Sequence, residues 1–184
     1  MEKGLYLVIS GPSGVGKDTV AKKLGGWISV SATSRGIRDG EEEGVNYFYH
    51  SREEMEALIA RGELLEYTLY NGEYYGTPLQ PIRDHFANGE LVILVIEVEG
   101  AANVKKAIPD AVTVFIMPPS MEELRERLIN RKTETAEQVE GRMQIAVREM
   151  EIGKTEYDYI VVNQEIEQAV SDILKIVEEE KKRR

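Results

Sequence analysis

The stretch Gly11-Pro-Ser-Gly-Val-Gly-Lys17 follows directly on the apolar run Leu5–Ser10 and precedes Thr19–Leu24, which has the pattern of a helix. It matches G-x-x-x-x-G-K, in which the glycines let backbone N–H groups turn inward around phosphate oxygens. Lys17 would reach the β- and γ-phosphates of a nucleotide. A glycine-rich turn without a ligand is the alternative interpretation. The phosphate-loop interpretation predicts that ATP is bound by Gly11, Pro12, Ser13, Gly14, Val15, Gly16, Lys17, Asp18 and Thr19.

Four apolar segments, each bounded by Gly, Pro or Asn, are predicted to form buried strands: Leu5–Ser10, Leu91–Val98, Val112–Met117 and Tyr159–Val162. Continuous apolar runs suit strands that are covered on both faces of a parallel sheet. Helical patterns lie between them, and such alternation implies right-handed crossovers. The sequence therefore predicts an α/β fold with three layers (α/β/α) and a parallel core sheet.

Local signals mark the ends of several helices. Ser51 and Glu54 form a capping-box pair ahead of an apolar helix face, and Gly62 is a plausible stop. Ser120 and Glu123 repeat the pair farther along the chain. Two more helices are predicted, over Pro81–Ala87 and roughly Glu165–Lys182.

Two stretches interrupt the alternation of strands and helices. Ser31–Thr77 is too long and polar for a simple connection, and Glu122–Thr155 is a charged helical excursion. We expect both to be inserts on one sheet, within a single domain that spans residues 1–184. Its expected parts are a core (about 1–31, 85–121 and 156–184), a first insert (about 32–84) and a helical lid (about 122–155).

The composition excludes several classes of function. The chain has 33 acidic and 23 basic side chains, a net charge of −10 and no cysteine. That charge argues against nucleic-acid polymers as partners, and the lack of cysteine excludes disulfides and thiolate metal sites. No apolar run approaches the ~20 residues of a membrane span, and the start of the chain lacks a signal peptide, so we expect a cytoplasmic protein with no membrane partner. Residues 1–40 nevertheless carry six basic and three acidic side chains, which indicates an anion-binding region.

Position 18 departs from the usual phosphate-loop motif, in which Ser or Thr offers a hydroxyl to Mg²⁺. Asp18 could ligate Mg²⁺ directly, since that ion favours carboxylate oxygen. The alternative is a surface carboxylate that is stabilised by the dipole at the start of a helix. Mg²⁺ is the cofactor that we expect, with ATP as co-substrate.

The first insert carries the pattern Ser31-Ala-Thr-Ser-Arg35-Gly-Ile-Arg38-Asp-Gly40-Glu41, followed by Gly44-Val-Asn-Tyr47-Phe48. Two arginines three residues apart, with a tyrosine nearby, make a plausible clamp for a phosphate monoester. Taken alone, the same arginines would be surface loop residues. Farther on come Leu65-Glu66-Tyr67 and Gly72-Glu-Tyr-Tyr75-Gly76-Thr77-Pro78.

Together these segments resemble the guanylate kinases, and the resemblance covers essentially the whole chain. It includes the phosphate loop, Ile96-Glu97-Val98-Glu99-Gly100-Ala101, Met117-Pro-Pro-Ser120 and Tyr157-Asp-Tyr-Ile-Val-Val-Asn163. The resemblance implies a nucleoside monophosphate kinase of purine nucleotide metabolism with a P-loop kinase fold. Such an enzyme transfers the γ-phosphoryl group of ATP to GMP or dGMP. The same resemblance implies that the first insert (about 32–84) is a GMP-binding insert.

The resemblance also implies roles for single residues. The phosphate of GMP would be held by Arg35, Arg38, Tyr47 and Tyr75. The guanine would lie near Ser31, Glu66, Thr77 and Glu97. Basic lid positions that fold over ATP match Arg127, Arg131 and Arg142, and a residue near the adenine matches Asn163. The catalytic residues expected on this basis are Lys17, Arg38, Arg131 and Arg142.

The chemistry of guanine supports the assignment of Glu66. Guanine presents N1–H and N2–H₂ as adjacent donors, and one carboxylate accepts hydrogen bonds from both. Adenine lacks the N1 proton and would leave the Glu66 carboxylate partly unpaired. Sites that bond a substrate's donors reject analogues lacking them by ~10⁴ or more. Glu66 is therefore expected to select the base; the alternative is a solvated acid at a strand end.

Two further positions depart from the family pattern. Val95 stands where the family usually carries an acidic residue near Mg²⁺, two positions before Glu97. We hypothesise that Asp18 compensates for that loss by moving the metal-side carboxylate to the phosphate loop. Lys132 replaces the glycine that commonly follows the lid arginine, which affects the flexibility expected of the lid.

Two other functions remain open on the sequence. Gly16-Lys17-Asp18 looks like the phosphate loop of the ribose 1,5-bisphosphate phosphokinases, but those enzymes do not need the motifs around Arg35 and Glu66. A non-catalytic guanylate-kinase-like module would bind phosphopeptides through the same arginines. Such modules typically have a degraded phosphate loop, whereas Lys17 and its glycines are intact here.

Overall fold

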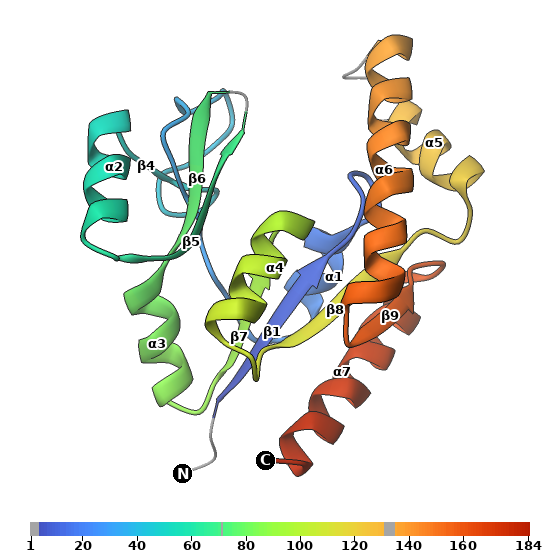
Figure 1. Ribbon diagram of the computed structural model, residues 1–184. Helices are drawn as coiled ribbons and strands as arrows, with labels where there is room; N and C mark the ends of the chain where they lie inside the picture. The colour runs from blue at the N-terminus through green and yellow to red at the C-terminus, as the bar shows by residue number, and fades with distance from the viewer. Residues whose placement is uncertain (1–3, 71, 131–134) are drawn as a thin grey trace.

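Among the residues that the computed structural model describes (4–70, 72–130 and 135–184), five strands form the core sheet (Figure 1). Every neighbouring pair in this sheet is parallel. The predicted parallel core sheet is therefore confirmed. In spatial order its strands are β2 (Trp27–Ile28), β7 (Leu91–Val95), β1 (Leu5–Ser10), β8 (Val112–Met117) and β9 (Tyr159–Val162).

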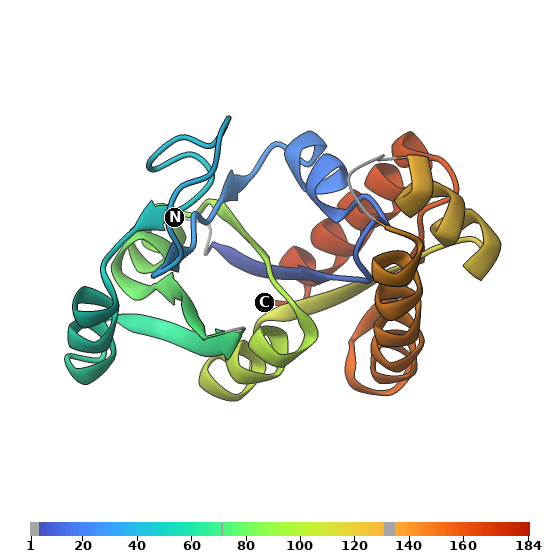
Figure 2. The same cartoon turned by 90° about the horizontal axis from the view of Figure 1, so that it is seen from above.

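Helices cover both faces of the core sheet (Figure 2). Successive side chains of β1 point to opposite faces, which explains its continuous apolar sequence. Leu7 and Ile9 pack on the side of α1 (Lys17–Lys23) and α7 (Ile166–Lys182). Tyr6 and Val8 pack on the side of α3 (Leu79–Ala87) and α4 (Val98–Ala107). The result is the predicted α/β/α arrangement.

A second sheet lies in the first insert, where the sequence had indicated only a long polar stretch. Its strands are β4 (Phe48–Tyr49), β3 (Ala32–Thr33), β6 (Glu73–Pro78) and β5 (Leu64–Tyr70), in that order, and α2 (Arg52–Ala60) packs beside it. The hairpin of β5 and β6 is antiparallel, and β3 pairs antiparallel with β6. Strands of two residues, such as β3 and β4, are too short for a periodic signal in the sequence.

The described residues of the second insert form two helices, α5 (Met121–Asn130) and α6 (Ala136–Glu156). They pack on one another through buried side chains that include Leu124, Leu128, Val139 and Met143. Figure 1 shows this pair and the second sheet on opposite sides of the carboxyl end of β1. No described helix is long and apolar enough to cross a membrane.

Several predicted boundaries are confirmed and three are wrong. One of the three is α1, which spans Lys17–Lys23 and not Thr19–Leu24. The capping box of α2 is present, with Glu54 N donating to Ser51 Oγ at 3.1 Å and Ser51 N to Glu54 Oε2 at 2.6 Å. The strand predicted over Leu91–Val98 ends at Val95, because the chain turns into α4 at Val98. Helix α3 begins at Leu79, before Pro81, because proline is tolerated in a first turn, where its missing N–H has no partner to lose.

Candidate active site

The phosphate loop leaves the carboxyl end of β1 and leads into α1. Gly14 and Gly16 have φ angles of 85° and 93°, which residues with a Cβ rarely adopt. The side chain of Lys17 is only 12% exposed, and its Nζ donates to the Gly11 carbonyl at 3.1 Å and lies 3.6 Å from Glu97 Oε1. The ammonium group is therefore held against the loop.

Asn163 and Arg127 support the outer side of the phosphate loop. Asn163 is 2% exposed, and its Nδ2 donates to the Val15 carbonyl at 2.8 Å. Arg127, from α5, donates to the same carbonyl at 3.4 Å and to the Asn163 carbonyl at 3.1 Å. A Cβ added at Gly16 would lie 2.8 Å from Asn163 Nδ2, so the loop and this amide are in close contact. Asn163, predicted to lie near adenine, and Arg127, predicted as a lid residue, thus both contact the backbone of the loop.

Of the other predicted lid arginines, Arg142 lies in α6. Arg142 Nη1 donates to Ser13 Oγ at 2.5 Å, which joins α6 to the phosphate loop. Arg131 and Lys132 lie outside the described residues.

Three of the four residues predicted to clamp a phosphate lie close together, around Arg35. Its guanidinium lies 5.3 Å from the centre of the Tyr47 ring, and the rings of Tyr47 and Tyr75 meet edge to face at 6.0 Å. Burial, with the neighbouring Tyr75, raises the pKa of Tyr47. Arg38 is exposed, and its backbone N–H donates to Glu41 at 2.9 Å. Arg35, Tyr47 and Tyr75 are therefore together, with Arg38 on the adjoining loop.

Glu66 and Thr77 form a buried pair across the hairpin of β5 and β6. Glu66 is 8% exposed and Thr77 is 1% exposed, and Thr77 Oγ1 donates to Glu66 Oε1 at 2.6 Å. Burial raises the pKa of Glu66, and the hydrogen bond from Thr77 opposes that rise. The pair places a carboxylate where little water reaches it. A ligand without hydrogen-bond donors for that carboxylate would therefore bind with an unfavourable free energy.

Ser31 and Glu97, the other residues predicted to lie near guanine, occupy different places. Ser31 precedes β3 and accepts a hydrogen bond from Phe48 N at 2.9 Å through its carbonyl, within the second sheet. Glu97 is the exposed N-cap residue of α4, beside Lys17 at the phosphate loop. The structure therefore groups Glu97 with the loop lysine.

Two acidic residues of the site were not singled out from the sequence. The Glu41 carboxylate accepts hydrogen bonds from both Nη atoms of Arg35 and from the Tyr49 hydroxyl, the last at 2.8 Å. The sequence could have marked Glu41, because it is the last residue of the motif that carries Arg35 and Arg38.

Glu149, on α6, is the second of these acidic residues and is half-buried. Burial and the charge of Glu97 raise its pKa to about 7, and the charge of Lys17 opposes that rise. Nothing in the local sequence marks Glu149, because its neighbours come from distant segments.

The carboxylate proposed for Mg²⁺ is accessible. Asp18 is exposed in the first turn of α1. Burial is the largest cause of the raised pKa of Tyr47, and the charge of Asp18 is a minor one. Val95 is half-buried at the end of β7. Within the described part of the chain no group of three or more His, Cys, Asp or Glu side chains could hold a metal ion.

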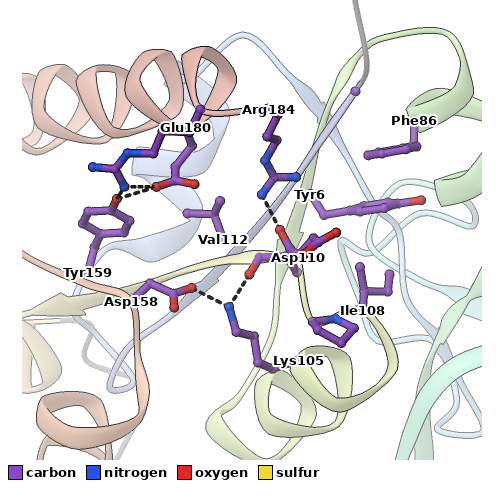
Figure 3. Close-up of a pocket in the computed structure, with 14 residues that line it drawn as sticks. Tyr6, Phe86, Lys105, Ile108, Asp110, Val112, Asp158, Tyr159, Glu180 and Arg184 are labelled. Atoms are coloured by element: carbon purple, nitrogen blue, oxygen red, sulfur yellow. Dashed lines mark hydrogen bonds and ion pairs between the residues drawn. The ribbon is translucent and has the colours of Figure 1, made fainter.

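A hollow of about 890 Å³ lies at the amino ends of β1 and β8 (Figure 3), and no residue of the phosphate loop lines it. Several of its polar side chains bond to each other. Lys105 Nζ is 2.8 Å from Asp158 Oδ2, and the Tyr159 hydroxyl donates to Glu180 Oε1 at 2.6 Å. These contacts join α4, β9 and α7, so we interpret the hollow as a structural junction.

The sequence and the fold match one family of known proteins. A family model described as guanylate kinase matches residues 3–180. A protein from Halalkalibacterium halodurans named guanylate kinase is 50% identical over 181 residues, covering 96% of this chain and 88% of the relative.

Solved structures agree with that match. The crystal structure of guanylate kinase from Anaplasma phagocytophilum superposes with a TM-score of 0.81 at 35% identity, covering 98% of this chain and 88% of that one. A gluconokinase from Sinorhizobium meliloti 1021 has a TM-score of 0.50 at 18% identity, covering 93% and 90%, and shows the kinase fold alone. The family-model match and the 50% identical relative together show that this chain belongs to the guanylate kinase family.

Proposed function

We propose that this protein is a cytoplasmic enzyme of purine nucleotide metabolism that transfers the γ-phosphoryl group of ATP to GMP or dGMP, giving ADP and GDP or dGDP. The single observation that carries the proposal is the buried pair of Glu66 and Thr77 in a chain with an intact phosphate loop. A ribose 1,5-bisphosphate kinase would not need such a base-reading carboxylate.

The acceptor base would be read by Glu66. One carboxylate accepts from guanine N1–H and N2–H₂, and the Thr77 hydroxyl fixes the orientation of that carboxylate. Ser31 and Glu97 are the other residues proposed on the GMP side. Because a carboxylate that lacks donors in a buried site is unfavourable, adenine would be rejected.

The phosphate of GMP would be bound by Arg35, Arg38, Tyr47 and Tyr75. Arg35 offers a planar guanidinium and the tyrosines offer hydroxyl donors, a combination suited to a dianionic phosphate. Glu41, by holding Arg35, would orient the guanidinium in advance.

ATP would be bound on the opposite side, by residues 11–19 with Arg127 and Asn163. Lys17, Arg38, Arg131 and Arg142 would neutralise the charge that develops as the phosphoryl group moves from the leaving oxygen of ADP to the GMP phosphate. Such a step involves little covalent chemistry for the protein, so positioning and electrostatics carry the catalysis.

Mg²⁺ is the proposed cofactor, and the donor set is compatible with it. Mg²⁺ commonly keeps several waters and binds through one or two carboxylates plus substrate phosphates, so a single accessible carboxylate at Asp18 is sufficient. When bound, Mg²⁺ would neutralise charge on the β- and γ-phosphates. The chain's contribution would be to direct the Asp18 oxygen toward those phosphates from the first turn of α1.

The two inserts (about 32–84 and 122–155) would move toward the core (about 1–31, 85–121 and 156–184) when both nucleotides bind. Closure would exclude water and limit wasteful hydrolysis of ATP. Small-angle scattering should therefore show a smaller radius of gyration with both nucleotides than without them; an unchanged radius would contradict closure.

A coupled assay of ADP release tests the proposed function. The wild-type protein is incubated with ATP and Mg²⁺ and, in turn, GMP, dGMP, AMP and ribose 1,5-bisphosphate. Turnover is expected with GMP and dGMP, and Lys17→Met should lower kcat by ~100-fold or more. Turnover with ribose 1,5-bisphosphate or AMP but not GMP would overturn the proposal, as would the absence of turnover with every acceptor.

A further inference from the structure

Gly100 lies in the first turn of α4, directly against the carboxylate of Glu66. Helix α4 and strand β5 are neighbours in the fold (Figure 1). A Cβ added at Gly100 would lie 3.1 Å from Glu66 Oε2, 3.5 Å from Glu66 Cδ and 3.6 Å from Ile96 Cβ. The bare helix backbone therefore forms one wall of the Glu66 site.

The backbone at this position does not need glycine. Gly100 is buried within a regular right-handed helix, and its φ lies outside the left-handed region that favours glycine. Alanine is the better helix former, because glycine loses more conformational freedom on folding. The reason for glycine at this position therefore lies in what a side chain would contact.

We propose that Gly100 is a specificity-determining position, which acts by leaving the Glu66 carboxylate the space it needs to face guanine. The inference rests on the proposed function, in which Glu66 reads the base. On this inference, a residue without a side chain takes part in selecting the base.

The contacts of Glu66 explain why a methyl group at position 100 would matter. A Cβ at 3.1 Å is tighter than nearly all real contacts of that kind, so the carboxylate must shift by a few tenths of an ångström. The shifting group is the end of a flexible side chain, so folding is little affected. Oε1, however, is bonded to Thr77 at 2.6 Å, so a shift alters the plane in which the carboxylate meets the base. Hydrogen bonds to N1–H and N2–H₂ depend on that plane.

Gly141 offers a matched control. It is also a helical glycine, in α6, but it is exposed and an added Cβ would meet nothing within 4 Å. Gly141→Ala therefore reports the gain in helix propensity without a contact. Gly100→Ala combines the same gain with the contact to Glu66.

The experiment measures kcat, KM and Tm for Gly100→Ala, Gly141→Ala, Glu66→Gln and the double variant Gly100→Ala/Glu66→Gln. Both alanine variants should keep Tm or raise it by ~2–4 °C. Gly100→Ala should raise KM for GMP by about tenfold, since sub-ångström misplacement of a binding group has effects of this order. KM for ATP should stay within about twofold in both alanine variants. In the Glu66→Gln background, Gly100→Ala should change KM for GMP by less than about twofold, because the two positions act through one group.

Inosine monophosphate provides a second measurement, one that a purely structural role of Gly100 would not change. It lacks the 2-amino group, so the preference for GMP over inosine monophosphate should fall in Gly100→Ala and not in Gly141→Ala. An unchanged KM for GMP in Gly100→Ala would overturn the inference. So would an equal effect in the Glu66→Gln background, or a lower Tm with equal losses for both substrates. A wild-type protein that does not phosphorylate GMP would instead refute the proposed function.

Discussion

Glu41 binds Arg35 through both of its carboxylate oxygens, with Arg35 Nη1 donating to Oε2 at 2.9 Å and Nη2 donating to Oε1 at 2.8 Å. Both side chains are largely removed from solvent, with 13% of Arg35 and 19% of Glu41 exposed. The pair occupies the Nη1–Nη2 edge of the guanidinium. The Nε–Nη2 edge is then the one that a phosphate can meet in a bidentate way.

Glu41→Gln should therefore weaken GMP binding without a matching effect on ATP. An amide accepts at one oxygen only, so Arg35 and Tyr49 lose part of their anchor, and we expect KM for GMP to rise by about tenfold or more. KM for ATP should change by less than about twofold. Steady-state kinetics with each substrate varied in turn measures both constants.

The control for this variant is Glu63→Gln. Glu63 also pairs with an arginine, Arg61, but both side chains are about half exposed, and exposed pairs contribute little. A similar change in KM for GMP in both variants would show that Glu41 has no special role.

The same ion pair should make the thermal stability of the protein depend on pH in the acidic range. The hydrogen bond from Arg35 lowers the pKa of Glu41 to about 2, from its ordinary value of 4.5. A lowered folded-state pKa contributes stability that is fully present above about pH 4.5 and is lost as the pH falls toward 2. The difference in Tm between the wild type and Glu41→Gln should thus shrink from pH 5 to pH 2. A constant difference across that range would contradict this account.

Glu66→Gln should remove base selection and spare the fold. The amide presents an N–H₂ group toward the donors of guanine, so kcat/KM for GMP should fall by ~100-fold or more while KM for ATP stays within about twofold. Because burial raises the pKa of Glu66, the ionised form is disfavoured in the folded protein, and a neutral side chain should leave Tm at pH 7 unchanged or higher. Equal losses for both nucleotides would remove the role given to Glu66.

Asn163→Asp should loosen the phosphate loop. The substitution keeps the shape of the side chain but replaces the donor to the Val15 carbonyl by a second acceptor. A lost buried hydrogen bond of ~1–3 kcal/mol corresponds to a decrease in Tm of a few degrees. KM for ATP should rise and KM for GMP should not. Asn88→Ala, at an exposed asparagine, is the control, and the same loss in both variants would argue against a loop-specific effect.

Asp18→Ser tests the compensation between positions 18 and 95. If Asp18 supplies the metal-side carboxylate, the free Mg²⁺ needed for half-maximal kcat should rise by about tenfold. Adding Val95→Asp, at the end of β7, should restore the original requirement. The titration is kcat against free Mg²⁺ at saturating nucleotides. An unchanged Mg²⁺ requirement in Asp18→Ser would contradict the hypothesis.

The sequence predicted four of the five strands of the described core sheet, and the phosphate loop, because their signals are local; β2, of two residues, was missed. The run Leu5–Ser10 is apolar at every position but its last, and the strand has those bounds. The capping pair Ser51 and Glu54 predicts the start of α2 because both hydrogen bonds lie within four residues. The α/β/α arrangement then follows from the alternation of such elements.

The tertiary structure alone decided which side chains meet. Glu97 lies beside Lys17, eighty positions earlier in the chain, and Gly100 touches Glu66 from another element. The second sheet was also decided there, since β3 and β4 are stabilised by partners that are distant in sequence. Backbone pairing, burial and the pKa of Glu149 depend on groups that the fold brings together, and no local pattern of residues encodes them. The sequence by itself determined the phosphate loop and the layers around it; the geometry of the candidate acceptor site came from long-range packing.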